Sequence, residues 1–157
     1  MTLSPLAYGL LALLAIALVV SVWTDVRERI IPNWLTGAVA LTAPVFWFAM
    51  GEGLWPHVAI HLLTALIVFA FFLLMFRFGM MGGGDVKLLT ALSLWLPWQA
   101  VYELVLFSSL FGIAVTAAFW AWHKARKAEG APEIPYGIAI SVAGLIIISE
   151  RYFNHFA

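Results

Sequence analysis

The chain has 157 residues, of which 64% are hydrophobic and only 10% are charged, and its formal net charge is zero. A soluble domain is usually about half apolar and about a quarter charged, so this composition predicts an integral membrane protein of the all-α class. The balanced charge gives no global attraction to nucleic acid, and the absence of cysteine excludes disulfides, thiolate metal sites and a cysteine nucleophile.

Apolar runs separated by glycine, proline or polar residues predict six membrane-spanning helices. The expected helices cover residues 3–23, 34–50, 57–77, 85–96, 101–122 and 136–153. No long polar stretch is present to serve as a linker, and no internal repeat stands out. The helices are therefore expected to form a single domain over residues 1–157.

The basic residues indicate which way the helices cross the membrane. Alternate connections share a side, and residues 24–33, 78–84 and 123–135, with their flanks, hold every lysine and arginine except Arg151. Such an excess is typical of the cytoplasmic side of a membrane. Both termini are then expected on the extracytoplasmic side.

Two aspartates stand near the cytoplasmic ends of predicted helices. Asp25 closes the first helix, and Asp85 opens the fourth, after a loop that ends in Gly82, Gly83 and Gly84. Glycine permits positive φ and close backbone approach. The fourth helix, at about 18 Å, is shorter than the hydrocarbon core, so we expect the loop to dip into the membrane with Asp85. A charged group at that depth is costly and is therefore a functional candidate.

Two facing carboxylates can hydrolyse a peptide bond. The ionised carboxylate takes a proton from the attacking water while the protonated one supports the developing oxyanion. Such a pair titrates as a unit, so the pattern does not assign the shared proton to Asp25 or to Asp85. The structural alternative for Asp25 is a charge that merely flanks a helix end beside Arg27 and Arg29.

Three motifs resemble those of the type IV prepilin leader peptidases. Residues 82–89, Gly-Gly-Gly-Asp-Val-Lys-Leu-Leu, are similar to the Gly-x-Gly-Asp signature of membrane aspartic proteases and to the Val-Lys-Leu that follows it in this family. Residues 25–27, Asp-Val-Arg, with 31–33, Ile-Pro-Asn, resemble the first aspartate motif of the family. Residues 134–137, Ile-Pro-Tyr-Gly, resemble the element that leads into its last helix.

The resemblance implies an aspartic endopeptidase that removes the short basic leader from prepilin-like precursors at the cytoplasmic membrane face. It implies Asp25 and Asp85 as the catalytic pair, with no cofactor and no metal. The expected partners are the lipid bilayer and a precursor made of a leader and an N-terminal apolar helix. Lys87 and Arg27 are candidate supporting residues.

The short connection at residues 24–33 distinguishes this chain from the longer members of the family. Bifunctional prepilin peptidases carry an extra cytoplasmic loop there, often with cysteine pairs, and also methylate the new N-terminus. The chain has neither the loop nor cysteine, which argues against N-methyltransferase activity. It resembles the short peptidases of Flp or tight-adherence pilus systems.

Two other classes compete with this interpretation. A presenilin-like protease would carry tyrosine before its first aspartate, where Thr24 stands here. A small proton- or ion-coupled transporter could use the same carboxylates, although transporter sites usually lie near the midplane between repeated halves. His57 and His61 have a spacing that suits a metal, but we expect them at the face opposite the aspartates, as a polar interfacial pair. Nothing in the pattern indicates an oligomeric state.

Overall fold

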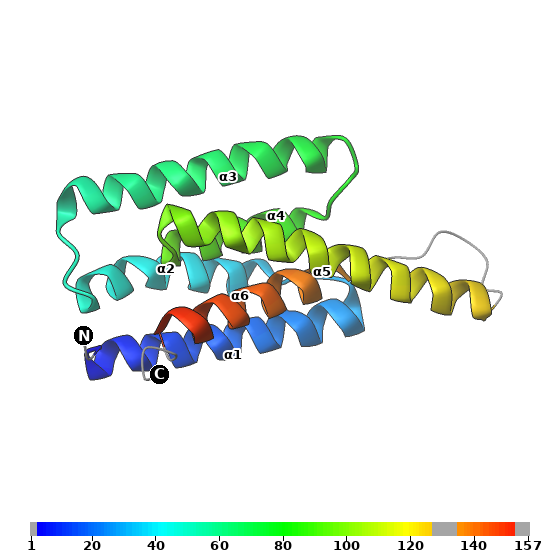
Figure 1. Cartoon of the computed structure of the whole chain (residues 1–157), viewed down its shortest axis with the longest axis horizontal. Helices are drawn as coiled ribbons and strands as arrows, with labels where there is room; N and C mark the ends of the chain where they lie inside the picture. The colour runs from blue at the N-terminus through cyan, green and yellow to red at the C-terminus, as the bar shows by residue number, and fades with distance from the viewer. Residues whose placement is uncertain (1–2, 127–134, 153–157) are drawn as a thin grey trace.

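The computed structural model describes residues 3–126 and 135–152, and all regular secondary structure within these ranges is helical. The helices are α1 (Pro5–Glu28), α2 (Asn33–Ala49), α3 (Ala59–Arg77), α4 (Gly83–Trp95), α5 (Trp98–Ala125) and α6 (Tyr136–Tyr152), with a short wide turn of helix, η1 (Leu54–Val58), before α3. They run side by side along one long axis (Figure 1). The predicted all-α class is confirmed, and the described residues form a helix in each of the six predicted places.

The bounds of α1 and α5 differ most from the predicted ones. α1 continues past residue 23 to Glu28, so Asp25 lies inside the helix. Polar residues after position 23 do not break a helix; α1 ends only at Arg29, whose φ of 57° is left-handed and whose N–H donates to the carbonyl of Asp25 at 3.1 Å. α5 begins at Trp98, after Pro97, and runs to Ala125, longer than the expected 101–122.

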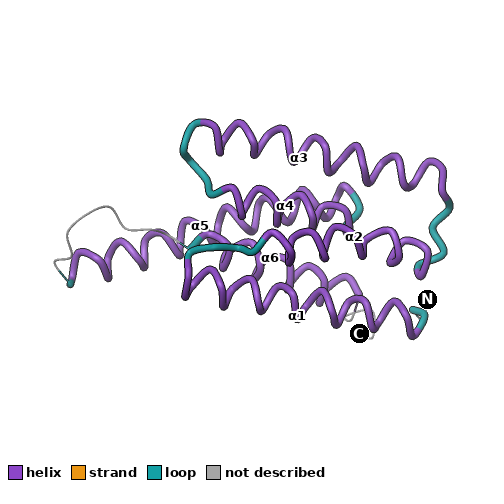
Figure 2. The backbone as a smooth tube through the Cα atoms, turned by 180° about the vertical axis from the view of Figure 1, so that it is seen from behind, coloured by secondary structure: helices purple, strands orange, loops and turns teal. Residues whose placement is uncertain are grey.

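α4 lies at the centre of the bundle, packed against α2, α3, α5 and α6, while α1 packs on α2 and α6. α3 forms one edge, held mainly by α4 (Figures 1 and 2). The indole of Trp95 is buried, stacks on Phe46 at 4.9 Å and donates to the carbonyl of Val39 at 2.8 Å. Trp47 donates in the same way to the carbonyl of Leu94 at 2.8 Å. These tryptophans tie α2 to α4 with satisfied polar groups.

The outer surface is apolar, as a lipid environment requires. Leu41, Leu66 and Ile113 are among many large apolar side chains that face outward. Within the described residues, three stretches are long and apolar enough to cross a membrane, namely Pro5–Glu28, Trp55–Arg77 and Trp98–Ala125. The predicted membrane character is confirmed.

The connections place the predicted site at one end of the bundle. The α1–α2 and α3–α4 connections lie together at the same end (Figure 2). α5 extends past this end beyond the other helices, whereas α1 begins and α6 ends at the far end (Figure 1). The end of α1 and the start of α4, which carry the two aspartates, are thereby brought close together.

Candidate active site

Asp25 and Asp85 are both buried at this end of the bundle, with 6% and 8% of their surfaces exposed. Asp25 comes from the last turns of α1 and Asp85 from the first turn of α4. The two carboxylates lie close enough to interact electrostatically. The structure therefore brings together two carboxylates that are far apart in the sequence.

The start of α6 holds Asp25 in place. The N–H of Gly137 donates to Oδ2 of Asp25 at 2.8 Å, and the N–H of Ile138 also hydrogen-bonds this carboxylate. The first N–H groups of a helix have no partner within the helix, and the helix dipole favours an anion there. The carboxylate of Asp25 thus satisfies donors that α6 would otherwise leave free.

Ile31 is the packing centre of the three sequence motifs. A Cβ atom added to Gly84 would lie 3.0 Å from Cβ of Ile31, and one added to Gly137 would lie 2.9 Å from Cδ1 of Ile31. The Cβ on Gly137 would also lie 2.8 Å from Oδ2 of Asp25. Glycine fits both positions without displacing a neighbour, whereas a Cβ at either one would force Ile31 or Asp25 to move.

The glycine run before Asp85 acts by close approach, and not by positive φ. Gly82 precedes α4 with an extended backbone, and its N–H hydrogen-bonds the carboxylate of Asp85. The prediction that all three glycines belong to the loop is wrong for Gly83 and Gly84, which form the first turn of α4. The helix can begin this early because glycine at position 84 lets its first turn pack directly on Ile31. Within the described residues, positive φ occurs in glycine only at Gly51 and Gly79.

Tyr136 joins the site from the other side, next to Gly137. Its side chain hydrogen-bonds Ser109 of α5 and lies near enough to Asp85 to interact with it electrostatically. The ring lies against Gly112 of α5, where an added Cβ would collide with Cε2 of Tyr136. Sequence reasoning missed Ser109 and Gly112, because nothing in the apolar run of α5 marks which of its residues face α6.

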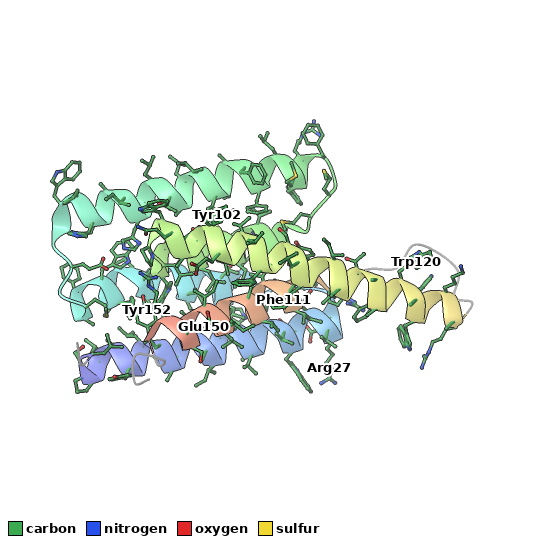
Figure 3. The ribbon with its side chains drawn as sticks, in the orientation of Figure 1. Arg27, Tyr102, Phe111, Trp120, Glu150 and Tyr152 are labelled. Atoms are coloured by element: carbon green, nitrogen blue, oxygen red, sulfur yellow. The ribbon has the colours of Figure 1, made fainter. Side chains whose placement is uncertain are left out.

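The two candidate supporting residues lie away from the carboxylates. Lys87 donates through Nζ to Oδ1 of Asn33 at 2.7 Å. Arg27 lies over the ring of Trp23, with 5.7 Å between Cζ and the ring centroid, and points away from the bundle (Figure 3).

Arg29 is the cation that interacts electrostatically with Asp25. Its guanidinium lies 5.0 Å from the ring centroid of Phe119 on α5, and its Nη1 is buried without a hydrogen-bond partner. Arg29 was not among the predicted site residues. Its position in the sequence gives no sign of the left-handed backbone turn that directs its side chain back toward Asp25.

His57 and His61 lie at the far end of the bundle. Nε2 of His61 is 3.1 Å from Oε2 of Glu52, and the imidazole stacks on Trp47 with centroids 5.1 Å apart. His57 stands in η1 and is exposed. Within the described ranges, no three His, Cys, Asp or Glu side chains are grouped to hold a metal ion.

The chain is similar in sequence to the members of one known family. The family described as the type IV leader peptidase family matches residues 12–117. A prepilin leader peptidase/N-methyltransferase of Pectobacterium carotovorum subsp. carotovorum is 30% identical over 154 residues, which cover 94% of this chain and 53% of that protein. The protein of the same name from Aeromonas hydrophila is 32% identical over 155 residues, 94% of this chain and 52% of its own. The chain spans about half the length of the curated relatives that it matches. No solved structure matches it.

Proposed function

Because the chain belongs to the type IV leader peptidase family, we propose that it is a membrane-embedded aspartic endopeptidase that removes the leader from type IV prepilin-like precursors. The observation that carries this proposal is the shared site of Asp25 and Asp85, two buried carboxylates from α1 and α4 within electrostatic range. Membrane proteins keep such groups for function, because burying them without one is costly.

The proposed chemistry uses one proton shared between the two aspartates. The ionised carboxylate takes a proton from water, the resulting hydroxide adds to the scissile carbonyl carbon, and the protonated carboxyl donates to the carbonyl oxygen. Collapse of the tetrahedral intermediate breaks the C–N bond, and a carboxyl proton passes to the leaving nitrogen. The hydrogen bond from Gly137 contributes by fixing one carboxylate oxygen of Asp25 before the reaction begins.

The proposed topology is six spans in a bacterial inner membrane, with the aspartates toward the cytoplasm and both termini outside. α5 supports this orientation. Its 28 residues would extend about 42 Å, more than the roughly 30 Å hydrocarbon core. At its projecting end Lys124 lies 5.2 Å from the ring of Trp120, and Arg126 lies 4.3 Å from that of Trp122. Tryptophans followed by basic residues are typical of the cytoplasmic interface.

The proposed substrate is a precursor with a basic leader followed by an apolar helix, and the proposed activity is cleavage without N-methylation. The names of the relatives include both activities. In this chain, however, only residues 29–32 separate α1 from α2, and cysteine is absent. This build supports a peptidase of the Flp or tight-adherence type. Nothing in the site or the comparisons favours the transporter alternative.

The decisive experiment is cleavage of a candidate prepilin by the purified protein in detergent, followed by mass spectrometry of the products. Asp25→Asn and Asp85→Asn should each abolish cleavage while the protein still inserts into membranes. Glu103→Gln, which changes an exposed carboxylate on α5, is the matched control and should cleave normally. Normal processing by either aspartate variant would refute the two-aspartate mechanism.

A further inference from the structure

A groove of about 320 Å³ lies between α2, α3 and α4, across α4 from the active site. Gly37 and Ala40 of α2 form one wall, Phe69 of α3 the other, and Ala91 and Leu94 of α4 the floor, with Lys87 at one end. Successive residues of an α-helix are turned by about 100°, so Lys87, Ala91 and Leu94 all lie roughly opposite Asp85 on α4. The groove is therefore separate from the site that the two aspartates form.

The groove is open because its two walls are both held by α4. α2 and α3 each pack against α4, and they meet each other at the far end of the bundle, where Trp47 stacks on His61. Gly37 and Ala40 add little bulk to the space between them. In a bilayer no water is present at this depth to fill an apolar groove, so lipid chains or another apolar segment must occupy it.

Lys87 gives the groove a positive charge at the end that lies toward the aspartates. Its Nζ donates to Oδ1 of Asn33 at 2.7 Å, and this partner is a neutral amide. No carboxylate in the described part of the chain lies within ion-pair distance of Lys87. An occupant with an apolar body and an anionic head at this end would therefore match both the lining and the charge.

We propose that this groove binds an anionic phospholipid, with the phosphate on Lys87 and one acyl chain along Gly37, Ala40 and Ala91. From Lys87 to Leu94 the floor of the groove is about 10 Å long, which fits within one leaflet of a hydrocarbon core of about 30 Å.

The position of the groove favours a lipid over the apolar helix of a precursor. A helix bound here would lie across α4 from Asp85 and would face away from the carboxylates. A single extended hydrocarbon chain is thin enough to enter the groove.

Native mass spectrometry of the purified protein with dioleoyl phosphatidylglycerol tests the site, with dioleoyl phosphatidylcholine and inorganic phosphate as comparison ligands. The wild-type protein should retain phosphatidylglycerol in preference to phosphatidylcholine. Lys87→Gln should weaken this binding about fivefold, as expected for one lysine beside an anionic headgroup. Gly37→Phe should weaken it about tenfold by displacing roughly two methylenes of the chain; a Cβ at Gly37 meets nothing within 4 Å, so the ring can enter the groove.

Two matched variants control for general effects. Lys124→Gln removes a lysine at the same end of the bundle but outside the groove, and Gly9→Phe adds the same ring at another open glycine. Both should bind phosphatidylglycerol like the wild type. Unchanged binding by both Lys87→Gln and Gly37→Phe would overturn the proposal. Displacement of the lipid by inorganic phosphate would overturn it as a site for an acyl chain, and displacement by a precursor's apolar helix would assign the groove to substrate. Lipid binding requires no cleavage, so this test is independent of the proposed peptidase activity.

Discussion

The backbone N–H of Gly137 donates a hydrogen bond of 2.8 Å to Oδ2 of Asp25, a residue 112 positions earlier in the chain. This contact joins the first turn of the last helix to the last turns of the first. It explains why a glycine stands at the start of α6, since a Cβ there would lie 2.8 Å from the carboxylate oxygen and 2.9 Å from Cδ1 of Ile31. Neighbours this close to a new Cβ have to move.

Substitution of Gly137 should therefore impair cleavage more than stability. In Gly137→Ala the new methyl group pushes the carboxylate of Asp25 away from its position, and displacements of about 1 Å in an active site cost about a hundredfold in rate. Cleavage of a candidate prepilin should fall by roughly tenfold to a hundredfold. Gly9→Ala, at an open position on α1, should cleave at the wild-type rate; equal rates for the two variants would contradict the role of Gly137.

The contact between Gly112 and Tyr136 should be sensitive to added volume. Gly112→Ala places a methyl group against the Tyr136 ring and should destabilise the protein by about 1–3 kcal/mol, as overpacking usually does. Thermal unfolding in detergent measures this change. The double variant Gly112→Ala with Tyr136→Leu should recover most of the stability, because the smaller side chain leaves room for the methyl group. If the double variant does not regain stability, the loss in Gly112→Ala does not come from the contact with Tyr136.

Arg29 and Arg27 form a matched pair of cations two residues apart. Arg29→Gln removes the positive charge that acts on Asp25 and should lower the rate of precursor cleavage about tenfold. Arg27→Gln removes an exposed cation that lies over Trp23 and should change the rate by less than about twofold, as surface charges usually contribute little. Initial cleavage rates at a fixed precursor concentration compare them. The opposite order of effects would show that Arg29 does not act on the dyad.

The buried indole of Trp95 should contribute to stability through its hydrogen bond as well as its packing. Trp95→Phe leaves the carbonyl of Val39 without its donor and leaves a void beside Phe46. The expected loss is about 1–3 kcal/mol from the unsatisfied group alone. Trp55→Phe changes a tryptophan that is 81% exposed and should leave the thermal midpoint unchanged. A similar midpoint for both variants would argue against the hydrogen bond.

Composition and hydropathy were enough to predict the helical class, the number of helices and their approximate bounds. These features depend on local sequence, because a bilayer requires long apolar helices. The end of α1 was mispredicted because the polar residues after position 23 are compatible with a helix, and the actual stop is the left-handed turn at Arg29. Hydropathy does not detect such a turn.

The site was predictable in part for a related reason. Asp25 and Asp85 are recognisable because a carboxylate is unusual beside apolar helices. The helical spacing from Asp85 also indicates that Lys87 points elsewhere. The hydrogen bond between Lys87 and Asn33 and the contact between Tyr136 and Gly112 depend on how different helices face one another. A single sequence carries no direct record of those contacts.

The hydrogen bond between Gly137 and Asp25 also has a consequence for biosynthesis. The donor belongs to α6, which leaves the ribosome after every other helix of the described fold. A nascent chain that contains only α1 to α5 already carries both aspartates, but its Asp25 still lacks the amide of Gly137. The order of translation thus delays this contact with Asp25 until α6 has been made.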